Sequence, residues 1–178
     1  MREHINPLEY GSHILSALQK GILLTTMADG RVNTMTIAWG WLGIDWNTPI
    51  FITLVRTNRL SRAFLDRNPE FTVNVPVGPH DRRILGIAGT KSGREMDKVA
   101  ELNLHLEAAE KISVPAVREL PLTLECQVIY RQPQKPDLIP SAIRNAYHPQ
   151  DVPSQVPGIN RDFHIAYYGA IVSAYILR

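Results

Sequence analysis

The sequence predicts a mainly β fold, an antiparallel sheet closed into a barrel with helices inserted between its strands. Apolar residues recur with period two in several segments, which is typical of strands. The pair Asp29-Gly30 suits the tight turn of a hairpin, and a hairpin joins antiparallel strands. Helical periods interrupt the strands only in places, and no GxGxxG motif follows a strand. These patterns exclude alternating βαβ units and a Rossmann fold.

The first elements are a helix and a strand that meet at Gly21. Apolar residues with helical spacing predict a helix over residues 12–21 that ends at this glycine. They are Ile14, Leu15 and Leu18. Residues 21–27 then predict a strand that runs into the Asp29-Gly30 turn.

The next segment, "NTMTIAWGWLG" over residues 33–43, predicts a strand with one bulky face and one bare face. The bulky residues are Met35, Ile37, Trp39 and Trp41, and the small ones are Thr34, Thr36, Ala38 and Gly40. Two interpretations stay open. The bare face packs against a helix or strand, or a planar ligand lies across it, with hydroxyl groups and exposed backbone as its polar partners. In the second case Trp39 would form a wall of the ligand pocket, and Trp41 would be buried in the core.

Three further elements follow before residue 76. Residues 49–57 are rich in β-branched side chains and predict a strand. Residues 58–68 switch to a helical period, with Asn58 placed to cap the helix. The stripe expected to be buried is Leu60, Phe64 and Leu65. Residues 70–76 alternate strictly and predict another strand.

The second half of the chain mixes helices, one long loop and two long strands. Residues 79–112 are expected to be mainly helical, with a glycine-bearing connection at 89–95. Strands are predicted over residues 122–131 and 162–178, the second with a bend or bulge at Gly169. Residues 132–158 are expected to be mostly loop, with a short helix near residues 141–148. Loops of this length are usually functional or pack on a partner.

The length, charge and composition limit the classes of protein to which this chain can belong. We expect one domain over residues 1–178, because no repeat divides the 178 residues and 44% are hydrophobic. The formal charge of +2 does not favour nucleic-acid binding. No segment is apolar enough for a signal peptide or a membrane span, and Cys126, the one cysteine, can form no intrachain disulfide. We therefore expect a cytoplasmic protein that does not bind membranes.

The sequence carries no motif for metal or hydrolase chemistry. Its six histidines show no HxH or HExxH spacing, so no metal site is expected. No GxSxG motif supports a nucleophilic serine. Cys126 lies within a predicted strand and is interpreted as a small buried hydrophobe.

Two basic segments are candidates for anion binding. In "VRTNRLSR", Arg56 ends a strand, and the residues that follow begin a helix. These are Asn58, Arg59, Ser61 and Arg62. Arginines are unfavourable in a first helical turn unless an anion is bound there, so we expect a phosphate rather than solvated side chains. In "GTKSGRE", the loop residues are Thr90, Lys91 and Ser92. They form an ordinary surface turn unless Lys91 binds the same anion as the arginines.

The order of these segments resembles the flavin reductase-like proteins, the flavoredoxin group in particular. The similarity runs from about Gly21 to Tyr175 and includes residues 21–76, "GTKSGREMDK", "LECQV" and "HIAYYGAIV". It implies a split β-barrel that binds FMN and works as a homodimer, with the flavin near the subunit interface.

The resemblance also implies roles for individual residues. Those that would line the flavin ring are Thr36, Ile37, Ala38 and Trp39. Those that would hold the phosphate or the ribityl chain are Arg56, Asn58, Arg59 and Ser61, with Thr90, Lys91 and Ser92 closing over it. His164 would lie near the nicotinamide or the flavin face. No catalytic acid or base is assigned, because hydride transfer relies on the cofactor's own chemistry.

The function implied is an oxidoreductase that passes electrons from NADH or NADPH to FMN and on to a small acceptor or a redox partner protein. Two departures from the family pattern support an alternative. Phe163 separates Asp162 from His164, and Ala170 stands where relatives often have glutamate. The alternative is an electron carrier with the same FMN site that a partner protein reduces. A third interpretation is an interaction protein without affinity for the cofactor.

Overall fold

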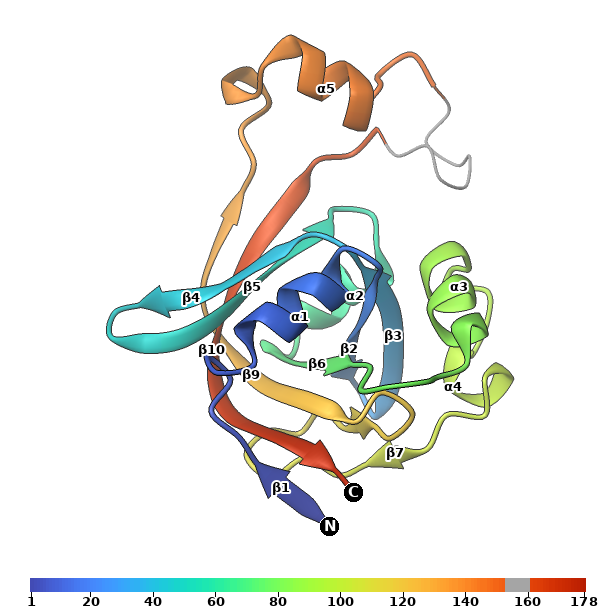
Figure 1. Ribbon diagram of the computed structural model, residues 1–178. Helices are drawn as coiled ribbons and strands as arrows, with labels where there is room; N and C mark the ends of the chain where they lie inside the picture. The colour runs from blue at the N-terminus through green and yellow to red at the C-terminus, as the bar shows by residue number, and fades with distance from the viewer. Residues whose placement is uncertain (153–160) are drawn as a thin grey trace.

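A split antiparallel barrel forms the body of the protein. The computed structural model describes residues 1–152 and 161–178. In this part of the chain eight strands form one antiparallel sheet in the order β3-β2-β6-β9-β10-β5-β4, with β1 paired to β10 (Figure 1). The outermost strands, β3 and β4, do not pair with each other, so the antiparallel sheet is confirmed but hydrogen bonds do not close it.

The predicted strands are found near their expected positions. The strands of the main sheet are β1 (Arg2–His4), β2 (Ile22–Ala28), β3 (Arg31–Ile37), β4 (Gly40–Asp45), β5 (Thr48–Arg56), β6 (Glu70–Val75), β9 (Leu122–Pro133) and β10 (His164–Leu177). A separate pair is β7 (Leu106–Glu107) with β8 (Ala116–Val117). The sequence patterns did not predict β1, β7 or β8. The β2–β3 turn has positive φ angles at Asp29 and Gly30, which confirms the predicted hairpin.

The single strand expected over residues 33–43 is wrong, because the chain changes pairing partner within it. Up to Ile37, β3 pairs with β2, whereas from Gly40 onward β4 pairs with β5. The two residues between them carry the chain from one edge of the split sheet to the other. Trp41 is 55% exposed and does not fill the core.

The small face of β3 packs against helices, as the first of the two interpretations expected. Thr36 lies opposite Leu23 of β2, on the face that α3 (Arg82–Thr90) covers. The hydroxyl of Thr36 donates a hydrogen bond of 2.6 Å to the carbonyl of Leu85 in that helix. Figure 1 shows α3 and α4 (Lys98–Glu101) beside β3.

The opposite face of the sheet encloses the main core. Ile22 and Leu24 of β2 and Ile37 of β3 point into it, together with side chains from β5, β6, β9 and β10. Helix α1 (Gly11–Leu18) adds Ile14 and Leu18 and covers one end of the core. Leu15, the third apolar residue of its predicted stripe, is instead 42% exposed. Cys126 lies in this core, as predicted.

The helical prediction for residues 79–112 holds only in part. Helix α3 is present, but α4 is a single turn that ends before Asn103, whose φ of 49° is left-handed. The chain then runs into β7. Helix α2 (Leu60–Leu65) is also shorter than predicted, and Phe64 and Leu65 are buried.

The predicted short helix in the long loop is confirmed as α5 (Ser141–Tyr147), preceded by a 3-10 turn, η1 (Pro136–Leu138). Figure 1 shows α5 standing apart from the barrel, at the ends of β9 and β10. Residues 153–158 of that loop prediction lie outside the described residues. Among the helices described, none has the length and apolar composition to cross a bilayer.

The predicted irregularity at Gly169 is confirmed, since the register between β9 and β10 shifts there. A Cβ at this position would lie 2.4 Å from Cζ of Phe71 and 2.8 Å from Cβ of Cys126. We expect Gly169→Ala to lower the free energy of unfolding by about 1–3 kcal/mol through overpacking, measured by urea denaturation.

Gly43 provides the matched control for this substitution. It also lies in a strand, but a Cβ there would meet nothing within 4 Å. Gly43→Ala is expected to change the free energy of unfolding by less than about 0.5 kcal/mol. Equal effects of the two substitutions would show that the tight contact is not what requires glycine at position 169.

Candidate functional site

Two adjoining cavities lie along the free edge of β3. The first, the strand-end cavity, has a volume of about 180 Å³. It is lined by Met35, Thr36, Ile37, Ala38, Trp39, Leu54, Arg56, Arg59 and His164. The second, the basic cavity, has a volume of about 730 Å³. Its lining includes Asn33, Met35, Thr36, Asn58, Arg59, Ser61, Lys91, Ser92, Arg94, Glu95 and Lys98.

Nearly all the site residues predicted from sequence line one of these cavities. The two cavities share Met35, Thr36 and Arg59, so the residues expected at a ring and those expected at a phosphate are continuous in space. Arg62 lines neither cavity and instead pairs with Asp66 at 3.0 Å. Thr90 also lines neither cavity. It ends α3, and its hydroxyl donates to the carbonyl of Gly86 at 2.8 Å.

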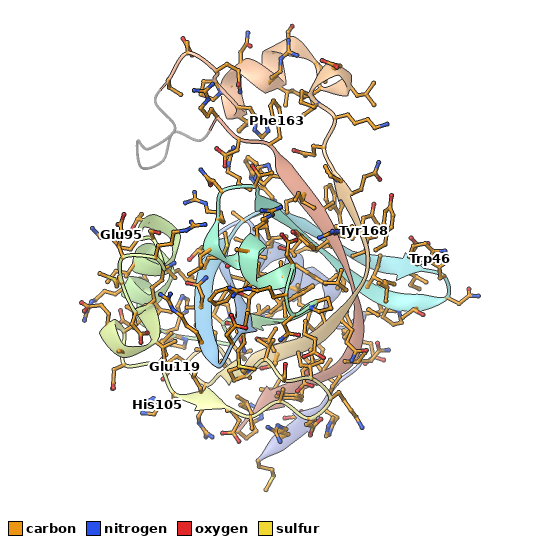
Figure 2. All side chains as sticks on the ribbon, turned by 180° about the vertical axis from the view of Figure 1, so that it is seen from behind. Trp46, Glu95, His105, Glu119, Phe163 and Tyr168 are labelled. Atoms are coloured by element: carbon orange, nitrogen blue, oxygen red, sulfur yellow. The ribbon has the colours of Figure 1, made fainter. Side chains whose placement is uncertain are left out.

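The basic cavity gathers positive charge from separate parts of the chain. Its lining includes Arg59, Lys91, Arg94 and Lys98 as cations and Glu95 as a carboxylate. Figure 2 shows Glu95 on the side of the molecule where α3 and α4 lie. Sequence reasoning missed Arg94 and Lys98. Arg94 lies within the glycine-bearing connection, directly after Gly93, and this position could have marked it. Its guanidinium donates to the carbonyl of Asn58 at 2.7 Å.

Lys98 is the buried cation of this group. It is 5% exposed, and its Nζ donates to the carbonyls of Thr34 at 2.9 Å and Ala88 at 3.0 Å. Burial, and after it the charge of Arg59, lowers the pKa of Lys98 to about 8. The ammonium is therefore charged at neutral pH and loses its proton under mildly alkaline conditions. No sequence pattern marked it, because its burial comes from contacts with β3 and α3.

Ser61 supports the wall of the basic cavity. Only 1% of it is exposed, and its hydroxyl accepts a hydrogen bond of 2.9 Å from Nδ2 of Asn33. Gly93 packs against the same asparagine so closely that a Cβ would lie 1.9 Å from Oδ1 of Asn33. The connection after α3 can approach β3 only because residue 93 is glycine.

Aromatic rings form the wall of the strand-end cavity. The ring of Trp39 lies 5.1 Å from that of His164 and 5.5 Å from that of Tyr147 at the end of α5. His148 stacks on Phe163 at 4.6 Å and meets His164 edge-on at 5.4 Å. Figure 2 places Phe163 directly beneath α5. The described part of the long loop thus packs on the site of its own chain.

His164 is a neutral imidazole in this wall. Burial, with the charges of Arg56, His148 and Arg59, lowers the pKa of His164 to about 3. Its Nδ1 is buried and has no hydrogen-bond partner among the described residues. A buried polar atom without a partner is uncommon, and at a cavity it marks a position for a ligand's polar group.

Arg56 holds the α5 segment onto the barrel. Its guanidinium donates to the carbonyl of Tyr147 at 3.0 Å and to that of Asp162. Burial lowers its pKa. The predicted cap at Asn58 is wrong, since Arg59 occupies the N-cap position of α2. The backbone and side-chain amides of Asn58 instead each donate to the carboxylate of Asp162 at 3.1 Å.

The arrangement suits a flat molecule with an anionic tail. Among the described strands β3 pairs only with β2, so the other side of its backbone is open to the cavities. A planar ring can lie along this edge between Thr36 and Trp39, with the neutral His164 nearby. Its tail would then reach the cations of the basic cavity, where phosphate forms charge-assisted hydrogen bonds. Together the cavities fall in the size range of cofactor sites.

Solved structures with the same fold include several flavoproteins. The flavoredoxin of Desulfovibrio vulgaris (Miyazaki F) is 21% identical, with a TM-score of 0.65 over 89% of this chain and 69% of that chain. The flavoredoxin of Methanosarcina acetivorans is 20% identical, with a TM-score of 0.64 over 89% and 68%. An FMN-binding domain of a flavin reductase-like enzyme from Shewanella baltica is 14% identical, with a TM-score of 0.65 over 99% and 77%.

Sequence comparison extends the similarity from the fold to the family. A protein of Archaeoglobus fulgidus is 27% identical over 127 residues, which cover 71% of this chain and 67% of that protein. The family described as "Flavin reductase like domain" matches residues 16–170, which include the lining of both cavities, the strands from β2 to β9 and the first half of β10. The chain therefore belongs to the flavin reductase-like family.

Proposed function

We propose that this protein is an FMN-dependent oxidoreductase that takes electrons from NADH or NADPH and passes them to a small acceptor or a redox partner protein. In this proposal residues 1–178 form one flavin reductase-like domain that works in the cytoplasm. The observation that carries it is the continuity of the strand-end cavity, which Trp39 and the neutral His164 line, with the basic cavity along the free edge of β3.

The residues present fit FMN at both ends. Arg59, Lys91 and Lys98 line the basic cavity, where they would bind the phosphate. The backbone from Thr36 to Trp39 would meet the polar edge of the ring. The unpartnered Nδ1 of the buried His164 could donate to or accept from the same molecule.

The chain's part in the reaction is to bind, orient and exclude water. Bound FMN would supply the capacity to accept a hydride and release electrons singly or in pairs. Trp39 lines the strand-end cavity, Tyr147 packs edge-on against Trp39, and Arg56 keeps Tyr147 in place by donating to its backbone carbonyl. His164 stays neutral, so it adds no positive charge next to the ring. No side chain is assigned as a catalytic acid or base.

We also propose a homodimer. The β4–β5 hairpin projects from the barrel, and Figure 2 shows Trp46 at its tip. Trp41 is 55% exposed, Ile44 65% and Trp46 62%. Large apolar side chains grouped on one hairpin are typical of a surface that a second subunit covers.

The alternative is an FMN-containing electron carrier that a partner protein reduces. It is favoured by the residues that lead into β10 and by the first half of that strand, where the family pattern changes. Phe163 stacks on His148, the carboxylate of Asp162 is bonded to Asn58, and Ala170 is buried where relatives often have glutamate. These contacts leave fewer polar groups for a nicotinamide ring.

Anaerobic reduction tests the donor. The purified protein loaded with FMN is expected to be yellow and to be bleached by NADH or NADPH without oxygen, as followed by stopped-flow absorbance. Dithionite serves as the positive control for a reducible flavin. Bleaching by dithionite but by neither nucleotide would reject the reductase and support the electron carrier.

The phosphate site is tested by removing its cations. Arg59→Ala and Lys91→Ala are each expected to weaken FMN affinity about tenfold, because each removes a charged partner of the phosphate. Flavin fluorescence quenching measures the dissociation constant. Lys111→Ala is the control, since Lys111 is exposed and lines neither cavity. Wild-type affinity in both cavity variants would show that the phosphate does not bind there.

Lys98 is expected to make FMN affinity depend on pH. Its pKa of about 8 in the folded protein means that the ammonium is present below this pH and lost above it. The positive charge, and the affinity for phosphate with it, should therefore fall as the pH rises from about 7 to 9. Lys98→Met should bind FMN more weakly and remove most of this pH dependence, with circular dichroism confirming its fold. An unchanged profile in the variant would exclude Lys98 as the titrating group.

A further inference from the structure

A third cavity lies at the N-terminal half of α3, whereas the basic cavity lies at its C-terminal end. This α1–α3 cavity has a volume of about 720 Å³. It is bounded by α1 and the turn after it, by the loop after β6, and by the first turns of α3. His13, Lys20, His80 and Arg82 bring cationic or imidazole groups to it, and the described residues of its lining include no aspartate or glutamate.

The two cations of this cavity are not neutralised by the protein. In the described part of the chain, neither Lys20 nor Arg82 makes a side-chain hydrogen bond or ion pair. The neighbouring carboxylate of Asp81 accepts a hydrogen bond of 2.8 Å from the backbone of Arg83 and caps α3. Two positive charges therefore border a cavity that contains no compensating negative charge, an arrangement that favours an anionic ligand.

The imidazoles are held by backbone groups and shape the cavity. A ring N–H of His13 donates to the carbonyl of Pro76 at 2.9 Å and ties α1 to the loop after β6. A ring N–H of His80 donates to the carbonyl of Gly78 at 3.3 Å. Ala17 and Leu85 add half-buried apolar surface between the cations. The cavity therefore combines positive charge with apolar walls, which suits an organic anion better than a simple ion.

The α1–α3 cavity reaches the proposed flavin site at Thr36. This residue lines all three cavities. Gly21 has a φ of 105°, and a Cβ there would lie 2.8 Å from Cγ2 of Thr36. The turn after α1 is therefore packed directly against the strand along which the flavin ring would lie. A ligand held by Lys20 and Arg82 would lie beside the strand that also borders the two proposed flavin cavities.

We propose that the α1–α3 cavity binds the phosphate groups of the nicotinamide nucleotide, with Lys20 and Arg82 as their partners. This inference rests on the proposed function, because it assumes that FMN occupies the basic and strand-end cavities. The phosphate of FMN and those of the nucleotide then have separate sets of cations at the two ends of α3. A nucleotide carries phosphates and a redox-active ring in one molecule, which matches a charged cavity that shares Thr36 with the proposed flavin site.

Binding of NADP⁺ to the FMN-loaded protein tests the proposal without any redox step. Isothermal titration calorimetry should show that Arg82→Ala and Lys20→Ala each weaken NADP⁺ binding about tenfold, since each removes a charge-assisted bond to phosphate. Arg83→Ala is the matched control, because Arg83 is next in sequence and exposed but does not line the cavity. It should change affinity less than about twofold. Inorganic pyrophosphate should compete with NADP⁺ in the wild type and lose this effect in Arg82→Ala.

The outcomes separate this proposal from the proposed function. FMN affinity, measured in parallel, should be unchanged in all three variants, because none of the residues lines the basic cavity. If FMN binds but the wild type does not bind NADP⁺, or if Arg82→Ala and Arg83→Ala have equal effects, the assignment of the α1–α3 cavity is overturned while the flavin site stands. A change in oligomeric size in Arg82→Ala would also overturn it, because the cavity would then be a subunit contact. Failure to bind FMN would reject the proposed function itself.

Discussion

The hydrogen bond from the hydroxyl of Thr36 to the carbonyl of Leu85 fixes how closely α3 approaches β3, and the site depends on that distance. At 2.6 Å it joins an edge strand to a helix that covers only part of that strand. The approach requires small residues on both sides, since a Cβ at Gly89 would already lie 3.2 Å from Cβ of Thr36. With α3 held here, Leu85 lines the α1–α3 cavity and Ala88 lines the basic cavity. The small side chains of β3 thus let α3 pack closely against the strand, and this packing forms part of the walls of both cavities.

Polarity changes along the edge of β3 in the way that an amphiphilic cofactor requires. At one end, burial and the charge of Arg56 keep His164 neutral beside aromatic rings. At the other end, Arg59 and Lys98 are close enough for the arginine to lower the pKa of the lysine. Like charges held together are unfavourable in the free protein, and a bound anion would relieve their repulsion. Repulsion of this kind is consistent with a site built for phosphate.

The segment that carries α5 shows how residues far apart in sequence complete the site. Arg56 and Asn58, at the end of β5 and just after it, bind the backbone and the carboxylate of Asp162 at the start of β10. Arg56 also binds the carbonyl of Tyr147, which places that ring against Trp39. The place of Arg56 at the site was predictable from sequence. Its hydrogen bonds to the carbonyls of Tyr147 and Asp162, which connect β5 to the α5 segment, were not. The aromatic wall therefore depends on two polar residues that the sequence associates with an anion and, for Asn58, with a helix cap.

The sequence by itself determined most strands of the main sheet, the Asp29-Gly30 hairpin and many of the residues that line the strand-end and basic cavities. Period, turn chemistry and the clustering of cations are local properties, so they can be read without knowing which segments meet. Only the tertiary structure decided that residues 33–43 divide between two strands, that Lys98 is buried, and that Asn58 binds Asp162 instead of capping α2. Lys98 bonds to the carbonyl of Thr34, 64 residues away, and Asn58 bonds to Asp162, 104 residues away, whereas the division of residues 33–43 follows from the choice of strand pairing. A local pattern cannot specify such a partner, because the free energy of a long-range contact is set by the whole packed arrangement around it.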